Sequence, residues 1–349
     1  MNAPADMGVV VVGAGDMGAR HAMHWQAAGA RVVAVIDRDL ERAAACATPL
    51  GAEHGADLAP YLTDPDVHVV SVCTPTFLHA LFTVPALQAG KHVLCEKPAA
   101  LTLEDARAMR AAAETSGREL RIGFMRRFDP AYEPLMSFAK RIGRPVLAQV
   151  TITAGVRPKR LMHDAMANGG PIIDMCCHIF TQWREMFGTQ PETVSARGYT
   201  FSDGKPEVAK IAQRALDSAL ITLEYGDGSV GQIQVSWGLP SGIDPVERHS
   251  YVGPDGLVIV DWPRRVTLRD AGGITRWASS GVDPWREEIA AFHRELTEGA
   301  QRRVATIEDG IEALITSLAA LRSVRERRPV SLDEVTTAPG GSRESVERA

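Results

Sequence analysis

The sequence predicts an α/β protein of two domains, a doubly wound parallel sheet followed by an α+β domain with an open, mainly antiparallel sheet. The chain has 349 residues, which is more than one hydrophobic core usually supports. Residues 8–124 alternate short β-branched runs with helical stretches, a rhythm typical of a parallel sheet. After about residue 125 hairpin signals replace that rhythm, which indicates an antiparallel sheet.

The first domain, expected over residues 1–124, contains apolar runs that are continuous rather than alternating, as in parallel strands covered on both faces. These runs are GVVVVG (8–13), RVVAVID (31–37), VHVVSVC (67–73), KHVLCE (91–96) and ELRIGF (119–124). Helical stretches separate the runs. Thr102 and Asp105 form a capping-box-like start of one helix, and Gly90 and Gly117 are candidate helix C-caps.

The second domain is expected over residues 125–334. Turn signals between its β-rich runs predict hairpins at YGDGS (225–229), GPDG (253–256) and DAGG (270–273). One helix is predicted over 168–187, and two more, PWREEIAAFHRELTEG and IEDGIEALITSLAALRSVRER, could pack back on the first domain. The tail, residues 335–349, is polar and contains Gly and Pro, so we expect it to be disordered.

Composition excludes several classes of protein. Hydrophobic residues make up 45% and charged residues 23%, as in ordinary globular proteins. The net charge of -5 does not fit a nucleic-acid-binding protein, and no run approaches the roughly 20 apolar residues that span a bilayer. The N-terminus lacks a signal-peptide layout, and five cysteines without CxxC argue against a disulfide framework or a metal site. We therefore expect a cytoplasmic protein with no membrane, nucleic-acid or metal partner.

The strongest motif is GAGDMG (13–18), a GxGxxG loop that follows a strand and opens a helix, as in a Rossmann dinucleotide-binding unit. Gly13 would allow the tight turn, Gly15 the approach of a pyrophosphate, and Gly18 the packing of helix on strand; Ala14, Asp16 and Met17 complete the loop. The alternative is a glycine-rich turn without a ligand. Because the strand, loop and helix follow in register, cofactor binding is the better interpretation.

Asp37 ends the second strand, at the distance expected for a ribose-binding acid. Its carboxylate would accept hydrogen bonds from the ribose hydroxyls and repel a 2′-phosphate, which favours NAD. Arg38 follows it and could pair with a 2′-phosphate, so NADP remains possible.

Two further segments follow predicted strands, at the sheet edge where a dinucleotide should lie. CTPTFLH (73–79) contributes the cofactor-contact candidates Cys73, Thr74, Pro75 and His79, and for His79 simple helix packing is an equal alternative. VLCEKP (93–98) leaves an apolar strand and at once presents Glu96 and Lys97 before a proline. Glu96 could hold Lys97 in place or contact the cofactor, and the sequence leaves both open.

A second constellation stands in NGGPIIDMCCHIF (168–180). Asp174 and His178 are four residues apart, so they would share one face of an otherwise apolar helix. A charged pair in such surroundings is costly unless it is paired or functional. A buried structural hydrogen bond is the equal alternative, whereas a metal site lacks a third ligand at a suitable spacing.

With GAGDMG, CTPTFLHA, EKP and GGPIIDMCCH in this order, the sequence resembles the glucose–fructose oxidoreductase / inositol dehydrogenase / MocA family over about residues 7 to 330. The resemblance implies a catalytic set of Lys97, Asp174 and His178. GFMRRFDPAY (123–132) resembles the myo-inositol dehydrogenase branch, which implies that Arg127 lines the substrate site. The family also implies a homodimer or homotetramer formed through the second sheet.

The expected reaction is oxidation of a secondary alcohol of a cyclic polyol or sugar, with NAD as hydride acceptor. His178 is the expected base, oriented by Asp174, and Lys97 would hydrogen-bond the reacting oxygen. Arg127 and His163 could bind other hydroxyls; the alternatives are a surface ion pair for Arg127 and a solvated loop for His163. Trp237 could stack on a sugar, although a buried sheet tryptophan is the better interpretation.

Two other functions are consistent with the sequence. One is an NADPH-dependent reductase of a keto-sugar or another carbonyl. The other is a catalytically silent NAD(P)-sensing binding protein, against which the joint presence of Lys97, Asp174 and His178 argues.

Overall fold

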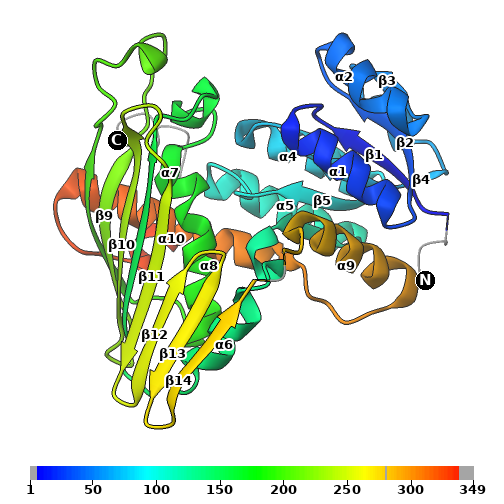
Figure 1. The fold of residues 1–349 in the computed structure, drawn as a ribbon. Coiled ribbons are helices and arrows are strands. Elements are labelled where there is room, and N and C mark those ends of the chain that lie inside the picture. Colours follow the sequence, from blue (N-terminus) through cyan, green and yellow to red (C-terminus); the bar gives the residue numbers. More distant parts are fainter. Residues whose placement is uncertain (1–5, 280, 338–349) are drawn as a thin grey trace. The chain divides into compact units, whose positions relative to one another are not determined.

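The computed structural model describes residues 6–279 and 281–337, which form two compact units (Figure 1). The first unit comprises the residues up to Phe128 together with Asp283–Ile311, and the second comprises Asp129–Val282 and the residues from Glu312 onward. The chain therefore returns to its first unit after building most of the second. Among the described residues no helix is both long and apolar enough to cross a bilayer.

Within the described residues, the first unit contains a seven-stranded sheet in the order β3-β2-β1-β4-β5-β6-β15. The strands are β1 (Gly8–Val12), β2 (Arg31–Ile36), β3 (Glu53–Gly55), β4 (Val67–Val72), β5 (His92–Glu96), β6 (Leu120–Gly123) and β15 (Ala305–Thr306). All neighbours pair in parallel except β15, which runs antiparallel to β6. This confirms the predicted doubly wound parallel sheet, with the reversal of strand order between β1 and β4.

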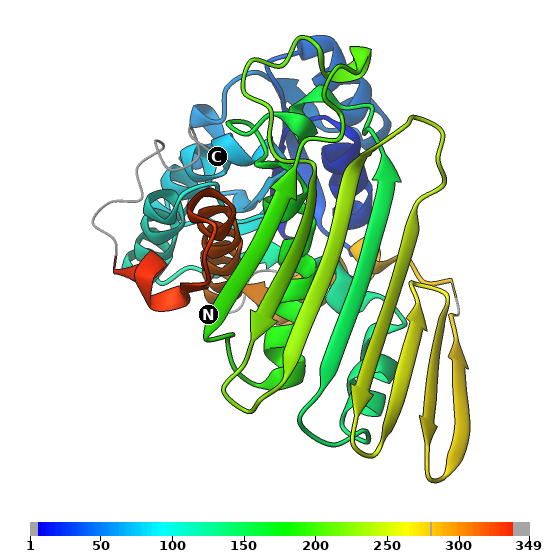
Figure 2. The ribbon, with the colours of Figure 1, turned by 90° about the vertical axis from the view of Figure 1, so that its left-hand side faces the viewer.

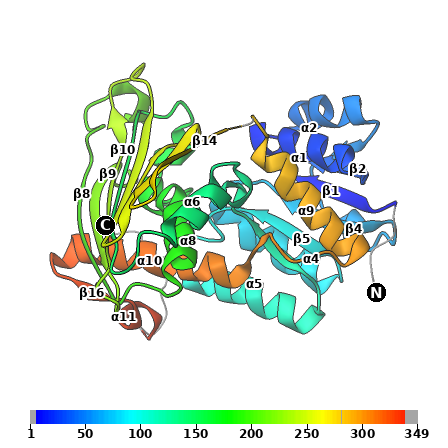
Figure 3. The same cartoon turned by 60° about the horizontal axis from the view of Figure 1, so that its bottom comes forward.

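The helices of this unit lie on both faces of its sheet, as Figures 1 and 3 show. They are α1 (Asp16–Ala27), α2 (Leu40–Ala47), α3 (Ala59–Leu62), α4 (His79–Gln88), α5 (Leu103–Ser116) and α9 (Pro284–Glu298). All of β1 is buried, which is why its sequence is continuously apolar. Helix α9 packs along α1, where Phe292 meets Trp25 edge to face at 6.1 Å between ring centroids.

The predicted helix caps of α5 are confirmed. The Thr102 side chain accepts a hydrogen bond from the Asp105 N–H at 3.1 Å. Gly117 ends the helix with φ 63°, in the left-handed region that favours glycine.

The second unit is built on a nine-stranded sheet, counted over the described residues, in the order β14-β13-β12-β11-β7-β10-β9-β8-β16. The strands are β7 (Leu147–Gly155), β8 (Thr193–Tyr199), β9 (Ser218–Glu224), β10 (Val230–Leu239), β11 (Val246–Gly253), β12 (Gly256–Asp261), β13 (Arg265–Asp270), β14 (Gly273–Ala278) and β16 (Val330–Ser331). The three predicted hairpins join β9 to β10, β11 to β12, and β13 to β14. Because β7 and β10 pair in parallel, the sheet is mainly rather than wholly antiparallel, as predicted.

One face of this sheet carries the helices α6 (Tyr132–Ala139), α7 (Gly170–Asp174) and α8 (Cys176–Phe187). Helix α6 packs on β12 and β13, and α7 packs on β10. Alternate residues such as Val150 and Ile152 are buried on this side, whereas Leu147 points to the other face and is 61% exposed. Figure 2 shows that other face with no helix in front of it.

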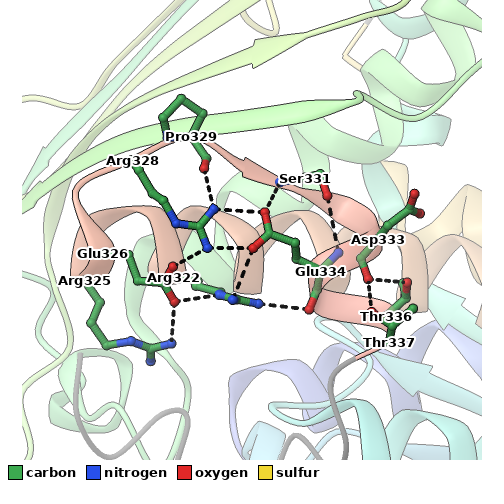
Figure 4. A network of polar contacts seen from close by, with 10 residues as sticks. All are labelled: Arg322, Arg325, Glu326, Arg328, Pro329, Ser331, Asp333, Glu334, Thr336 and Thr337. Carbon is green, nitrogen blue, oxygen red and sulfur yellow. Dashed lines mark hydrogen bonds and ion pairs between the residues drawn. The ribbon is translucent and has the colours of Figure 1, made fainter.

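The described chain closes with α10 (Ile307–Glu326), β16 and α11 (Leu332–Thr336). Arg328 joins two carboxylates there, at 2.5 Å from Glu326 and 2.6 Å from Glu334 (Figure 4). Glu334 also completes a capping box with Ser331 at the start of α11. Of the tail predicted over 335–349, the first residues end α11, and residues 338–349 lie outside the described residues.

A prediction about this network concerns the charge of Glu334. Its hydrogen bond with Arg328, together with that from the Ser331 N–H, lowers the pKa of Glu334 to about 2. The stability that this interaction contributes is therefore fully present above pH 4.5 and is lost as the pH falls toward 2. We expect Arg328→Gln to raise the pKa of Glu334 toward 4.5, measured by carboxyl-carbon NMR titration. Arg325→Gln, which removes a cation near Glu326 only, should leave it unchanged. A value that stays near 2 in Arg328→Gln would contradict this assignment.

Candidate active site

The three glycines of the GAGDMG loop are required for different reasons. Gly13 has φ 98°, which only glycine adopts readily. A Cβ on Gly18 would lie 1.6 Å from the Gly13 carbonyl oxygen, so Gly18 is required for packing. Gly15 has an ordinary extended conformation, φ -73° and ψ -173°, and its Cβ would meet nothing within 4 Å. Neither strain nor packing explains Gly15, whereas an open approach to the N-terminus of α1 does, because that end binds phosphate.

Asp37 is fixed beside this loop. Its Oδ2 accepts a hydrogen bond from the Ala14 N–H at 2.8 Å, and its Oδ1 accepts one from the Asp39 N–H at 2.9 Å. Each carboxylate oxygen retains a further lone pair for a ribose hydroxyl. The neighbouring Arg38 is exposed. This geometry is compatible with the cofactor contacts predicted for the loop and for Asp37, which stay predictions.

The segment after β4 offers an unsatisfied hydroxyl. Thr74 Oγ1 is buried and has no hydrogen-bond partner among the described residues, so it can serve a bound cofactor. His79 differs, because its ring is already engaged by main-chain carbonyls: Nδ1 lies 2.9 Å from the Pro98 oxygen and Nε2 lies 3.0 Å from the Thr74 oxygen. Burial lowers the pKa of His79. These contacts favour the packing alternative for His79, which joins the segments after β4 and β5.

Glu96 sits in a buried hydrogen-bonded chain that sequence reasoning missed. Trp25 Nε1 donates to Ser71 Oγ at 3.1 Å, and His21 Nδ1 lies 2.9 Å from the same oxygen. His21 Nε2 lies 3.0 Å from Glu96 Oε1, and Glu96 Oε2 accepts the Lys97 N–H at 3.2 Å. Burial opposes the charge on Glu96, but the His21 hydrogen bond and nearby cations outweigh it, and the pKa of Glu96 is lowered. Of the two roles left open for Glu96, these contacts fit the holding of Lys97.

A second carboxyl group, also unpredicted, lies in α9. Glu288 is fully buried, and neither of its oxygens has a hydrogen-bond partner among the residues that the structure describes. Burial and repulsion from Glu96 raise its pKa well above the ordinary value, against the opposing effect of Arg127. The pKa values of the two buried carboxyl groups are therefore shifted in opposite directions, lowered for Glu96 and raised for Glu288.

Arg127 lies in the short 3₁₀ segment Met125–Phe128. Its guanidinium donates to both carboxylate oxygens of Asp309, at 3.2 and 2.8 Å. The pair is largely buried, with side-chain exposures of 17% and 14%. Burial alone would raise the pKa of Asp309, but Arg127 lowers it. The substrate contact predicted for Arg127 stays a prediction, and Asp309 had no signal in the sequence.

Asp174 and His178 lie in the second unit, on either side of a helix break. The helix predicted over 168–187 is interrupted at Met175, so Asp174 ends α7 and His178 lies in the first turn of α8. Both side chains are buried, at 5% and 6% exposure. Cys177 Sγ donates to the Asp174 carbonyl at 3.2 Å, which ties the end of α7 to α8.

His163 belongs to the core of the second unit rather than to a solvated loop, so that alternative is wrong. The residue is 2% exposed, and its Nε2 accepts the Arg157 N–H at 2.9 Å. Its ring meets Trp237 edge to face at 6.5 Å between centroids. Trp237 is itself buried in β10 at 3% exposure, as predicted for a sheet tryptophan. Burial lowers the pKa of His163, and a neutral ring is consistent with Nε2 acting as an acceptor.

The structure thus distributes the predicted residues between its units. The first unit holds the cofactor loop, Asp37, Thr74, Lys97 and Arg127, and the second holds His163, Asp174 and His178. In the part of the chain that the structure describes, no group of three or more His, Cys, Asp or Glu is arranged to hold a metal ion.

A prediction follows from the different environments of the loop glycines. Gly15→Ala should keep the melting temperature of the wild type, because its methyl group would enter open space. Its affinity for NAD⁺ should fall at least about tenfold, equivalent to 1.4 kcal/mol, because the methyl blocks the phosphate approach. Gly18→Ala should instead lower the melting temperature, because its methyl meets main-chain atoms. Calorimetry and NAD⁺ titration test both variants; wild-type NAD⁺ binding by Gly15→Ala would refute the ligand explanation.

Another prediction concerns the raised pKa of Glu288. In the unfolded chain this carboxyl ionises near pH 4.5, whereas the folded protein keeps it protonated to much higher pH. The unfolded state therefore binds fewer protons, and the free energy of unfolding falls as pH rises above 4.5, by at most about 1.4 kcal/mol per pH unit. Glu288→Gln does not lose stability in this way, so its free energy of unfolding should rise relative to that of the wild type as the pH increases above 4.5.

Denaturant unfolding at several pH values measures this difference. Glu287→Gln makes the same change of residue type on the same helix and should leave the pH dependence as in the wild type. Parallel stability curves for Glu288→Gln and the wild type would mean that Glu288 is ionised in the folded protein.

Comparison with known proteins identifies the family. Residues 7–124 match the GFO_IDH_MocA model, described as an oxidoreductase family with an NAD-binding Rossmann fold. Residues 138–252 match the model of the GFO/IDH/MocA C-terminal domain. Both matches agree with the units found in the structure.

Individual relatives cover nearly the whole chain. The 1,5-anhydro-D-fructose reductase of Ensifer adhaerens is 31% identical over 309 residues, which are 85% of this chain and 90% of the reductase. The myo-inositol 2-dehydrogenase of Thermotoga maritima is 29% identical over 341 residues, covering 94% of this chain and 99% of that enzyme. A protein of gentamicin A biosynthesis, solved in complex with NAD, is 25% identical with a TM-score of 0.78 over 93% of this chain and 96% of its own. The chain belongs to the GFO/IDH/MocA family of oxidoreductases, and residues 7–124 form its NAD-binding Rossmann domain.

Proposed function

We propose that the protein is an NAD-dependent dehydrogenase that oxidises a secondary alcohol of a cyclic polyol or sugar. The observation that carries this proposal is the fixed position of Lys97. It leaves the carboxyl end of β5, where a Rossmann sheet receives its dinucleotide, and its main-chain N–H is held by the buried Glu96. A lysine held at that edge suits a group that hydrogen-bonds the reacting oxygen.

The cofactor preference rests on Asp37. Its carboxylate is hydrogen-bonded to the glycine loop, so it cannot turn away from a ribose placed there, and its charge disfavours a 2′-phosphate. NADP use, with reduction of a keto-sugar or another carbonyl, is the second candidate, favoured by the exposed Arg38 and by the relative named as a reductase.

The proposed roles of the side chains follow from their chemistry. NAD, when bound, accepts the hydride. His178 takes the hydroxyl proton, and the Asp174 carboxylate orients the ring and stabilises the imidazolium that results. The Lys97 ammonium hydrogen-bonds the same oxygen and stabilises the developing alkoxide. Arg127 and His163 supply hydrogen-bond donors for other groups of the substrate.

The substrate class is supported by the relatives. Their names describe enzymes that act on an inositol and on an anhydro-sugar. The combined presence of Lys97, Asp174 and His178 favours an enzyme over a sensor of NAD(P) that has lost catalysis.

We further propose a homodimer or homotetramer assembled through the open face of the second sheet. Leu147, Val252 and Ile274 lie on that face, connected strand to strand by their register. Each is more than two-fifths exposed, and exposed apolar rows of this kind mark interaction surfaces.

None of the five cysteines forms a disulfide, which fits the cytoplasmic location that we propose.

The proposed mechanism predicts the behaviour of Lys97→Ala. Turnover should fall by roughly 10² to 10³ or more, because the donor to the reacting oxygen is lost, while NAD⁺ affinity stays close to that of the wild type. Absorbance of NADH over a panel of inositols, aldoses and sugar acids, with NAD⁺ or NADP⁺, measures the turnover. Lys140→Ala, on the exposed end of α6, serves as the control.

Three outcomes would contradict this proposal. Substantial activity in Lys97→Ala would remove Lys97 from the mechanism. Much tighter binding of NADP⁺ than of NAD⁺ would overturn the role given to Asp37. A wild-type protein that binds NAD⁺ but oxidises or reduces nothing in the panel would favour the sensor.

A further inference from the structure

Arg157, a partly buried residue of the second unit, has a buried guanidinium nitrogen without a hydrogen-bond partner among the described residues. It follows β7, and its guanidinium carbon lies over the Trp237 ring, 5.4 Å from the ring centroid. The buried nitrogen is Nε. Removing a guanidinium N–H from water without an acceptor is costly. An acceptor supplied by a ligand would remove that cost.

Arg121 and Arg127 of the first unit also bury one guanidinium nitrogen each without a hydrogen-bond partner among the described residues, Nη2 and Nε respectively, but both guanidinium groups are paired with a carboxylate. Arg121 pairs with Glu295 at 3.1 Å, and Arg127 pairs with Asp309 at 2.8 Å. No carboxylate of the described residues forms an ion pair with Arg157. The charge of Asp217 acts on His163, but its oxygens are engaged by the N–H groups of Phe201 and Ser202 and by the Ser218 hydroxyl. Arg157 therefore lacks an ion-pair partner within the described part of the chain.

His163 provides a second, independent donor at the same place. Its Nε2 accepts the Arg157 N–H, so the neutral ring must carry its proton on Nδ1. That Nδ1 is buried and has no hydrogen-bond partner among the described residues, and the residue as a whole is 2% exposed. The Nε–H of Arg157 and the Nδ1–H of His163 are thus two unsatisfied donors on side chains that share the Trp237 ring.

The surroundings favour an anion over a neutral hydroxyl. The segment GVRPKRLMH (155–163) contains three Arg or Lys residues and no acid, within a chain of net charge -5. Its 3₁₀ turn Arg160–His163 packs against α7, the helix that ends at Asp174, and β10 with Trp237 packs against α7 as well. The two donors therefore adjoin the helix that carries a proposed catalytic residue in the same unit.

We propose that Arg157 and His163, supported by the Trp237 ring, form an anion-binding subsite, and that the substrate is a sugar bearing a carboxylate or a phosphate ester. The guanidinium binds the anionic group through charge-assisted hydrogen bonds, and His163 adds a neutral donor. Trp237 fixes the plane of the guanidinium. This inference rests on the proposed dehydrogenase function, which it narrows to charged sugars.

The test compares sugars that differ only in the anionic group. The kcat/KM with NAD⁺ is measured for D-glucose, D-glucuronate and D-glucose 6-phosphate in the wild type, Arg157→Gln, Arg157→Lys and Arg160→Gln. Arg160 is an exposed cation of the same segment, so Arg160→Gln is a matched loss of charge. Melting temperatures exclude variants that fail to fold.

We expect one of the two anionic sugars to exceed glucose in kcat/KM in the wild type. Arg157→Gln should remove that advantage by roughly tenfold to a hundredfold, mainly through KM, because one charge-assisted interaction is lost. Arg157→Lys should recover part of it, and Arg160→Gln should stay within about twofold of the wild type. A preference for D-glucuronate would identify the anionic group as a carboxylate, and a preference for D-glucose 6-phosphate would identify it as a phosphate. A preference for glucose that Arg157→Gln leaves unchanged would overturn the subsite.

Equilibrium binding separates this inference from the proposed function. Titration calorimetry with D-glucuronate and D-glucose 6-phosphate uses the wild type and Arg157→Gln in the presence of NAD⁺, and needs no turnover. Anion binding that is lost in Arg157→Gln, without oxidation of any sugar, would support the subsite and contradict the dehydrogenase. Oxidation of neutral sugars or inositols that Arg157→Gln leaves unchanged would support the dehydrogenase and contradict the subsite.

Discussion

The buried negative charge of Glu96 is the constraint on which the first unit depends at its ligand-binding edge. A carboxylate that is 6% exposed is stable only if its oxygens are hydrogen-bonded. His21 of α1 and the Lys97 N–H supply those bonds, and Ser71 of β4 holds His21 in turn. One charge therefore joins α1, β4 and β5. Because α1 begins at the glycine loop, the same chain of contacts sets the position of the loop and of Lys97.

The raised pKa of Glu288 is partly a consequence of this constraint. Burial disfavours a charge on Glu288, and the charge of Glu96 disfavours it further. Glu96 has a histidine ring and a main-chain N–H as donors, whereas Glu288 has no protein donor among the described residues. Glu288 therefore holds its proton to higher pH than Glu96 does.

Local patterns in the sequence were sufficient to predict the five main strands of the first sheet, the three hairpins of the second and the glycine loop between β1 and α1. Each of these depends on neighbouring residues: continuous apolar runs, turn residues, and glycines at fixed spacing. The polar contacts of the site were not predictable in the same way. His21 and Glu96 are 75 residues apart and Arg127 and Asp309 are 182 apart, so nothing local links them. The break at Met175 was also missed, because Gly169 and Pro171 predict where a helix starts and not where it is interrupted.

Arg127 and Arg157 are both arginines that follow a strand, but the structure gives them different surroundings. Arg127 was assigned to substrate through a motif, yet its guanidinium is matched by both oxygens of Asp309. Arg157 had no motif, yet it lies on Trp237, and no described carboxylate pairs with its guanidinium. An arginine whose charge is already matched gains little from an anion, whereas an unmatched one gains a full charge-assisted interaction. Arg157 is therefore the better candidate for binding an anionic group, whereas the Asp309 pair fixes the position of Arg127 and of the segment after β6.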